Sequence, residues 1–218
     1  MKLGTAFHAA VLEPERFESE YAACDFDRRA KNGKTSAANM ESAGIILLPR
    51  EDFESVQRMR DAVLAHRTAA ELLQSQGVAE SSWFATVNGV ECKCRPDKLS
   101  HDGIVVDLKS TVNANPREFG RTVFNFGYHL QACHYMSVLQ TAEVRAKSFI
   151  LVACEKDKPF GVSVHMLDDD AMELGYTQHS RLLDVYRHCL AVNDWPSYGD
   201  DIFITSLHTW AYRNAEEI

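Results

Sequence analysis

Residues 95–110 read RPDKLSHDGIVVDLKS, and this stretch decides the fold. It carries an acid after a proline (Asp97), a glycine-containing turn, a short apolar strand, and then the acid-x-lysine pair Asp107 and Lys109. Metal-dependent cleavage of a phosphodiester needs such groups, because two carboxylates can hold divalent metal and a lysine can orient water or neutralise charge on the phosphate. The stretch therefore predicts a catalytic strand.

Strand alternation gives this stretch its geometry. Residues two apart in a strand point to the same side, so Asp107 and Lys109 share one face. Val106 and Leu108 point the other way, into a core. An isolated acid-x-lysine pair is usually a solvated strand edge, but the preceding Pro-Asp, the turn and the apolar strand favour a catalytic pair.

Two turn signals divide the region from about residue 82 to residue 110. Asn88-Gly89 lies between two strand-like runs and is a strong hairpin signal. Asp102-Gly103 predicts a second turn. We therefore predict three consecutive antiparallel strands with charge concentrated on one face. Such charge is costly unless it is solvated, paired or bound to metal; the residues on this face are Glu91, Lys93, Arg95 and Asp97.

Composition bounds the class of protein. The 218 residues can form one large domain with a proper core, and 45% are hydrophobic and 25% charged. The net charge of −8 argues against a generally basic nucleic-acid binder, although local basic clusters remain. No run approaches the roughly 18 apolar residues that span a membrane, and the six cysteines are scattered, so we expect a cytoplasmic protein with reduced thiols and no membrane partner.

Apolar periodicity predicts the remaining elements. Helices are expected over residues 3–12, 51–76, 116–126, 128–140 and 168–192, strands over 147–154 and 160–167, and a polar loop over 22–42. This order predicts an α/β or α+β fold, with a central mixed sheet flanked by helices. No repeat or domain boundary is evident, and we expect residues 1–218 to form a single domain.

Five short motifs in this order resemble those of the PD-(D/E)xK nuclease superfamily: Gly4-x-x-x-His8, Glu80-x-Ser82, Pro96-Asp97, Asp107-x-Lys109 and Gln131-x-x-x-Tyr135. More narrowly, the chain is similar to RecB-type nuclease domains, lambda exonuclease and the RecE-type exonuclease, exodeoxyribonuclease VIII. The resemblance implies a restriction-endonuclease-like core in an exonuclease domain.

The resemblance also implies roles at the metal site. Asp97, Asp107, the Leu108 carbonyl and His8 would ligate Mg²⁺ or Mn²⁺, with two ions expected. Lys109 would position or activate the attacking water. A lone helical histidine is more often a core or surface residue, and the ligand role of His8 depends on the motif around it.

Other residues would support catalysis or bind DNA. Glu80, expected just before the first strand, would brace the site or touch metal through water; the alternative is a solvated acid. Gln131 and Tyr135 share a helix face and would contact phosphate or brace the site. Contacts to DNA phosphate are expected from the basic loop and the strands, at Arg28, Arg29, Lys34, Arg95 and Ser110. The alternatives are a solvated loop for the two arginines and strand-end capping for the serine.

The implied activity is Mg²⁺-dependent, 5′-to-3′ exonuclease digestion of double-stranded DNA ends, which leaves 3′ overhangs for recombination by strand annealing. A homo-oligomeric ring, trimer or tetramer, and a single-strand annealing protein are the expected partners. Two alternatives stay open. One is an endonuclease or an iron–sulfur-containing nuclease of the same superfamily, against which the scattered cysteines argue. The other is a non-catalytic module that binds DNA ends.

Overall fold

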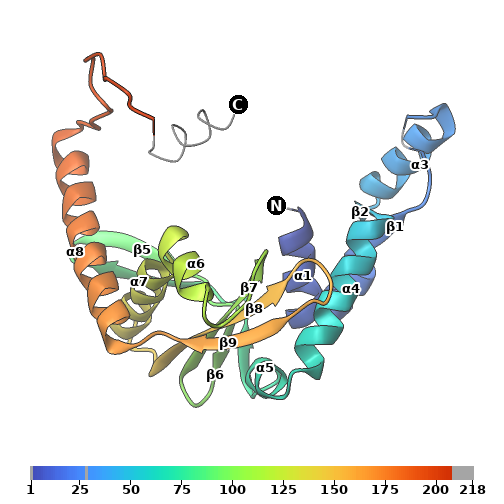
Figure 1. Cartoon of the computed structure of the whole chain (residues 1–218), viewed down its shortest axis with the longest axis horizontal. Coiled ribbons are helices and arrows are strands. Elements are labelled where there is room, and N and C mark those ends of the chain that lie inside the picture. The colour runs from blue at the N-terminus through green and yellow to red at the C-terminus, as the bar shows by residue number, and fades with distance from the viewer. Residues whose placement is uncertain (1, 28, 208–218) are drawn as a thin grey trace, which may run out of the picture.

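A computed structural model of the chain describes residues 2–27 and 29–207 (Figure 1). The helices are α1 (Lys2–Leu12), α2 (Pro14–Glu20), α3 (Lys31–Ser42), α4 (Arg50–Ala65), α5 (Arg67–Leu73), α6 (Phe119–Asn125), α7 (Tyr128–Thr141) and α8 (Asp169–Val192). The strands are β1 (Tyr21–Cys24), β2 (Ile46–Pro49), β3 (Gly77–Ala79), β4 (Trp83–Val87), β5 (Val90–Cys94), β6 (Lys98–Ser100), β7 (Ile104–Thr111), β8 (Ser148–Glu155) and β9 (Val162–Met166).

The central sheet has five strands in the order β3-β6-β7-β8-β9. β7 and β8 run parallel over their whole length, whereas the other neighbours in this sheet are antiparallel. Parallel strands need a crossover connection, and α6 and α7 supply it between β7 and β8. The predicted fold class, a mixed sheet flanked by helices, is confirmed.

Helices cover both faces of this sheet because the strand residues alternate between two apolar cores. On one face, Val106 and Leu108 of β7 pack with α1, α2, α4 and α5. On the other face, Val105 packs with α6, α7, α8 and the β4–β5 hairpin. β7 is buried on both sides, and the prediction that Val106 and Leu108 enter a core is confirmed.

β7 extends beyond its neighbour β6. The two strands pair only at Lys98↔Val106 and Leu99↔Val105. One more step in this register would set Asp97 opposite Asp107. Pro96 comes immediately before Asp97, on the side away from β6, and proline cannot donate a hydrogen bond to a neighbouring strand. The upper half of β7 is therefore paired with β8 alone, and its other edge is open to side chains from both helical layers.

The turn signals are confirmed, but the predicted three-stranded meander is wrong. Asn88 and Gly89 have φ angles of 48° and 78° and connect β4 to β5, and Gly103 (φ 88°) precedes β7. However, β4 and β5 form a separate two-stranded sheet, whereas β6 and β7 belong to the central one. Glu91 and Lys93 are accordingly solvent-exposed on the hairpin rather than aligned with Asp97.

Two other segments differ from the sequence-based expectation. Residues 22–42 contain β1 and α3 rather than a loop; β1 is held by parallel pairing with β2, a non-local contact that composition does not reveal. The helix expected over 51–76 is divided at His66, whose side chain caps α5 by accepting from the Ala69 N–H. β3 then begins at Gly77.

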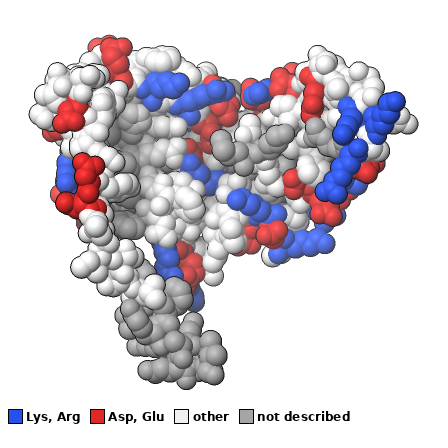
Figure 2. Space-filling model, turned by 90° about the horizontal axis from the view of Figure 1, so that it is seen from above, with Lys and Arg blue, Asp and Glu red and all other residues white. Residues whose placement is uncertain are grey.

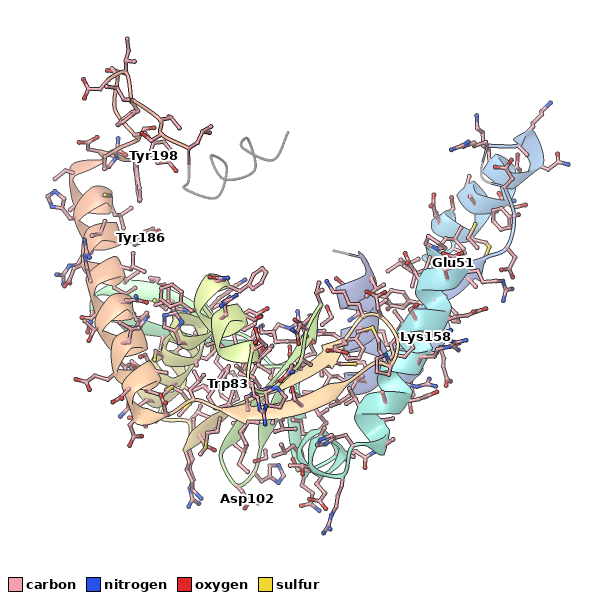
Figure 3. All side chains as sticks on the ribbon, viewed as in Figure 1. Glu51, Trp83, Asp102, Lys158, Tyr186 and Tyr198 are labelled. Atoms are coloured by element: carbon pink, nitrogen blue, oxygen red, sulfur yellow. The ribbon has the colours of Figure 1, made fainter. Side chains whose placement is uncertain are left out.

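The chain forms a sheet base with two raised sides (Figure 1). α8 rises on one side, and α4 leads to α3, β1 and β2 on the other. Asp102, in the turn before β7, lies at the bottom of Figure 3, so β7 runs from there toward the region between α1 and α6. No helix in the described part of the chain is long and apolar enough to cross a membrane.

Candidate metal centre

Three potential metal ligands converge beside the open edge of β7. One ligand atom from each of His8, Glu80 and Asp97 lies within 4.8 Å of the others. His8 Nδ1 is 3.2 Å from Asp97 Oδ1 and 4.0 Å from Glu80 Oε1. The second oxygen of Asp97, Oδ2, accepts a 2.5 Å hydrogen bond from the Leu108 N–H. Asp97 thus connects the ligand group to the strand that carries Asp107.

α1 brings His8 to this edge from one helical layer. Phe7, the preceding residue, is fully buried in the core beneath α1. One turn earlier, a Cβ added at Gly4 would lie 3.5 Å from Ser110 Oγ, an ordinary contact, so α1 lies directly against β7 there. Burial acts to lower the pKa of His8, but the hydrogen bond with Asp97 and nearby carboxylate charges outweigh it, and the pKa is raised.

Glu80 lies between β3 and β4, so it does precede the strand Trp83–Val87 as expected, but it also follows β3, a strand that the sequence analysis did not predict. Its φ angle of 50° is left-handed, a conformation that costs non-glycine residues about 1–3 kcal/mol. Two bonds hold it: its N–H donates to the Asp97 carbonyl, and its carbonyl accepts from Arg95 Nε. Arg95 Nε also lies 2.8 Å from Glu80 Oε2. This strained backbone directs the carboxylate toward His8 and Asp97.

Asp107 and Lys109 project to the α7 side, on the face that alternation predicted for both. Lys109 Nζ lies 2.6 Å from Asp107 Oδ2. Gln131 of α7 joins the two, because its Nε2 donates to Asp107 Oδ1 at 2.8 Å and its Oε1 accepts from Lys109 Nζ at 2.8 Å. The glutamine amide therefore fixes both the carboxylate and the amine in one arrangement.

Electrostatics at this site favours an added cation. Burial raises the pKa of Asp107 to about 6; the charge of Asp97 adds to this effect and Lys109 opposes it. Burial and then the charge of Asp97 also raise the pKa of Glu80. The pKa of Lys109 is raised as well, because Asp107 more than offsets its burial. Three carboxylates therefore repel one another in a largely buried site.

The residues present fit a divalent metal ion. Asp107 Oδ2 is buried and, although it is close to Lys109 Nζ, it accepts no directed hydrogen bond from the described residues. Carboxylate oxygens and a histidine nitrogen form a donor set suited to Mg²⁺ or Mn²⁺. The N–H and C=O of one strand residue face the same edge, so the Leu108 carbonyl shares the edge to which Asp97 binds. Asp107 is not a member of the group formed by His8, Glu80 and Asp97, and the bond from the Leu108 N–H to Asp97 connects that group to the strand of Asp107.

Two tyrosines of α7 complete the site, and only one was expected. Tyr135 is half-buried and interacts with Gln131, as a brace would. Tyr128, which the sequence analysis missed, places its ring 4.4 Å from Lys109 Nζ, within cation–π range. A signal for it existed: Tyr128 lies three residues before Gln131 and seven before Tyr135, so all three share one helix face.

The predicted DNA contacts are divided by the fold. Ser110 lies in β7 beside α1, and Arg95 borders a groove of about 330 Å³ next to His8 and Glu80. Arg29 and Lys34 lie before and within α3, at the outer end of the raised side, so the structure does not bring them to the metal centre (Figure 1). Arg28 lies outside the described residues. The phosphate-binding role of all five stays a prediction.

Charge on the molecular surface is mixed. Figure 2 shows Lys and Arg side chains interspersed with Asp and Glu, with more basic groups over the α3 side than over the α8 side. The six cysteines are all free thiols, and in residues 2–27 and 29–207 none joins a group of metal ligands.

Comparisons with known proteins identify the family of the chain and a solved structure that shares its fold. The family model of a PDDEXK-like domain of unknown function (DUF3799) matches residues 1–205. A candidate exonuclease from Eubacterium rectale shares the fold, with a TM-score of 0.57 at 11% identity over 82% of this chain and 74% of that chain. An alkaline exonuclease from Laribacter hongkongensis aligns over 87% of this chain and 97% of its own at 14% identity, but its TM-score is only 0.34. No curated protein matches the chain.

Proposed function

The chain belongs to the PDDEXK-like family of unknown function (DUF3799), and from this premise we propose that it is a divalent-metal-dependent deoxyribonuclease. The family and the fold support a nuclease. The finer proposal is an exonuclease that digests duplex DNA from its ends in the presence of Mg²⁺ or Mn²⁺, with residues 1–218 as one exonuclease domain.

One observation carries this proposal. Where β7 passes the end of β6, an α1 histidine, two carboxylates and an adjacent Asp–Lys–Gln arrangement meet at one strand edge. Such a concentration of like charge is unfavourable unless it binds cations or substrate. The arrangement provides both a site for metal and a fixed ammonium group next to it.

His8, Glu80, Asp97 and Asp107, with the Leu108 carbonyl, would hold the metal. When bound, the metal supplies positive charge for the scissile phosphate and lowers the pKa of coordinated water. The Leu108 N–H orients Asp97, and Arg95 orients Glu80, so the ligands are positioned by the fold before any ion arrives.

Lys109 acts as a cation in this mechanism. Its raised pKa keeps the amine protonated, and an ammonium group donates hydrogen bonds but accepts none. Its role is therefore to hold an attacking water or a phosphate oxygen and to neutralise the charge that develops there. Gln131 and the Tyr128 ring keep the amine in place while substrate enters.

Polarity and assembly are further parts of the proposal and depend on the resemblance to RecE-type and lambda-type exonucleases. These parts are 5′-to-3′ digestion that leaves 3′ overhangs, a closed ring of three or four subunits, and action beside a single-strand annealing protein in recombination. A ring would keep the enzyme on its DNA through many cycles. A cytoplasmic location follows from the cysteine usage and stays a prediction.

The test is digestion of linear duplex DNA labelled at either end, with Mg²⁺, with Mn²⁺ and with chelator, beside circular duplex. We expect metal-dependent release of nucleotides from linear DNA, loss of the 5′ label first, and intact circles. Cleavage of circular duplex would contradict the exonuclease proposal and show an endonuclease. Binding of DNA ends without cleavage under any metal would contradict the nuclease and favour a non-catalytic module.

A further inference from the structure

A column of aromatic rings leads from solvent to the amine of Lys109. Phe126 is 70% exposed, although it is one of the largest apolar residues. Its ring is nearly parallel to that of Tyr128, with centroids 5.7 Å apart and planes inclined by 20°. The Tyr128 ring in turn lies 4.4 Å from Lys109 Nζ. An exposed apolar ring so close to the candidate catalytic lysine needs an explanation.

Phe126 lies in the tight turn between α6 and α7, which leaves its side chain exposed. α6 ends at Asn125, and Gly127, with a φ of 66°, reverses the chain before α7 begins at Tyr128. Phe126 is the single residue between the helix end and this glycine. Its ring is therefore held at the rim of the site by Tyr128 rather than packed in the core, and it contributes little buried area to stability.

We propose that Phe126 and Tyr128 form a stacking platform for one unpaired nucleobase of the strand that is cut. This inference depends on the proposed nuclease function and narrows its substrate: the nucleotide at the site is single-stranded, in a frayed, melted or overhanging end. Every base offers a π-face, so such a platform binds without sequence preference. A base in a closed duplex is already stacked and could not occupy it.

Two basic residues lie on the same stretch of chain as the platform. Arg117 and Arg121 are exposed at the start of the same segment, and among the described residues neither forms an ion pair. Proteins that bind single strands combine such basic groups with aromatic rings that stack on successive bases. The platform would bind the base, and Lys109, next to the Tyr128 ring, offers a charge for its phosphate.

The chain provides a matched control. Phe84 of β4 is 69% exposed, the same as Phe126 within a percent, but it belongs to the separate β4–β5 sheet. No ring stacks on Phe84 in the part of the chain that the structure describes. Replacing either phenylalanine removes an equally exposed apolar side chain, and only Phe126 lies at the proposed platform.

The test uses short single strands that carry 2-aminopurine at one position, bound by the whole protein with Ca²⁺ in place of Mg²⁺ and checked on gels for integrity. Stacking on an aromatic ring quenches this fluorophore. We expect quenching by wild type and F84A, little by F126A, and restored quenching by F126W. F126L, which keeps apolar bulk without a ring, should behave like F126A.

A second arm removes the base instead of the ring. An abasic site at the same position should weaken binding to wild type and F84A by roughly 5- to 150-fold, the usual range for one stacked base. F126A should bind the two strands equally. Equal loss in all three proteins would contradict the platform, and so would a change in sedimentation of F126A with unchanged DNA binding, which would assign Phe126 to an interface between subunits.

These binding measurements do not require cleavage. If the protein shows base-dependent quenching but no metal-dependent digestion, the nuclease proposal is contradicted and the stacking platform is supported. Digestion by wild type together with quenching that is indifferent to Phe126 would keep the nuclease and remove the platform. Melting curves of each variant confirm that folding is unchanged.

Discussion

The two halves of β7 differ in both pairing and chemistry. Residues 104–106 are apolar, and Val105 and Val106 pair with β6 on one side and β8 on the other. From Asp107 to Thr111 the strand pairs with β8 alone and carries an acid, a lysine, a serine and a threonine. One half is structural, and the other faces a region that both helical layers can reach.

This difference explains how His8 and Gln131 can serve one site from opposite sides of a sheet. A strand paired on both edges separates the two layers completely. β6 does not extend beyond Lys98, its first residue, so β7 has a free edge from Asp107 onward. This edge lets Asp97 accept a hydrogen bond from the Leu108 N–H and lets α1 and α7 both approach this part of β7. The candidate site residues thus gather where β7 is paired with β8 alone. The following substitutions test whether function and stability divide in this way along the strand.

The largest effect on the cleavage rate should come from a substitution in the open half of β7, compared with one in the paired half. Asp107→Asn should reduce cleavage by on the order of 10³-fold, because it removes a ligand charge and an anchor of Lys109, while the protein stays folded. Val106→Ala should leave cleavage unchanged below the melting temperature but cost about 2 kcal/mol of stability. Cleavage rates and thermal melts of both variants make the comparison; equal losses of activity would contradict it.

A smaller loss should follow from Gln131→Leu. This side chain touches Asp107 and Lys109 but is not a proposed metal ligand, so its removal should lower the turnover rate roughly 10- to 100-fold through misplaced groups. Metal-induced stabilisation should persist in this variant. Loss of that stabilisation in Gln131→Leu would show that the glutamine supports metal binding rather than the amine.

Metal should stabilise the open half of the strand. Mn²⁺ at about 100 times its dissociation constant adds roughly 2.7 kcal/mol to the free energy of unfolding, which we expect as an upward shift in melting temperature. Asp97→Asn should abolish the shift. The control is Glu91→Gln, an exposed acid on the β4–β5 hairpin, which should keep it. A shift that survives in Asp97→Asn would place the metal elsewhere.

The smallest effect concerns pH in the presence of chelator. The pKa of Asp107 is raised to about 6, so the folded state holds the proton of this carboxyl more tightly than the unfolded chain does, and ionising it lowers the free energy of unfolding. The stability contribution of the protonated form is complete below the unfolded value near 3.8 and is lost as pH rises through about 6. Asp107→Asn should therefore melt above wild type at pH 7 and converge with it near pH 4. A constant difference across this range would contradict the assignment.

Local rules predicted the central part of the site. Alternation placed Asp107 and Lys109 on one face, helical spacing placed Gln131 and Tyr135 together, and Asn88-Gly89 predicted its hairpin. Each of these inferences uses contacts within a few residues along the chain. Backbone geometry determines such contacts directly, so the sequence alone was sufficient.

Non-local contacts were the source of the errors. Nothing in residues 82–110 shows that β5 leaves the sheet while β6 joins it, because sheet membership depends on partners such as β3 and β8. α3 has no apolar stripe to reveal it, and β1 is stabilised by a strand 25 residues further along, at the pairing Tyr21↔Ile46. The role of Tyr128 depends on the position of Lys109, which lies on another element.

The open edge of β7 should bind divalent metal between the carboxylate of Asp107 in β7 and that of Asp97, which lies just before β6. Anomalous scattering from crystals grown with Mn²⁺ tests it most directly. We predict a manganese peak in contact with the carboxylates of Asp97 and Asp107, with His8 or Glu80 completing the ligand set. Crystals saturated with Mn²⁺ that show no peak there, or a peak only at other acids, would contradict the account.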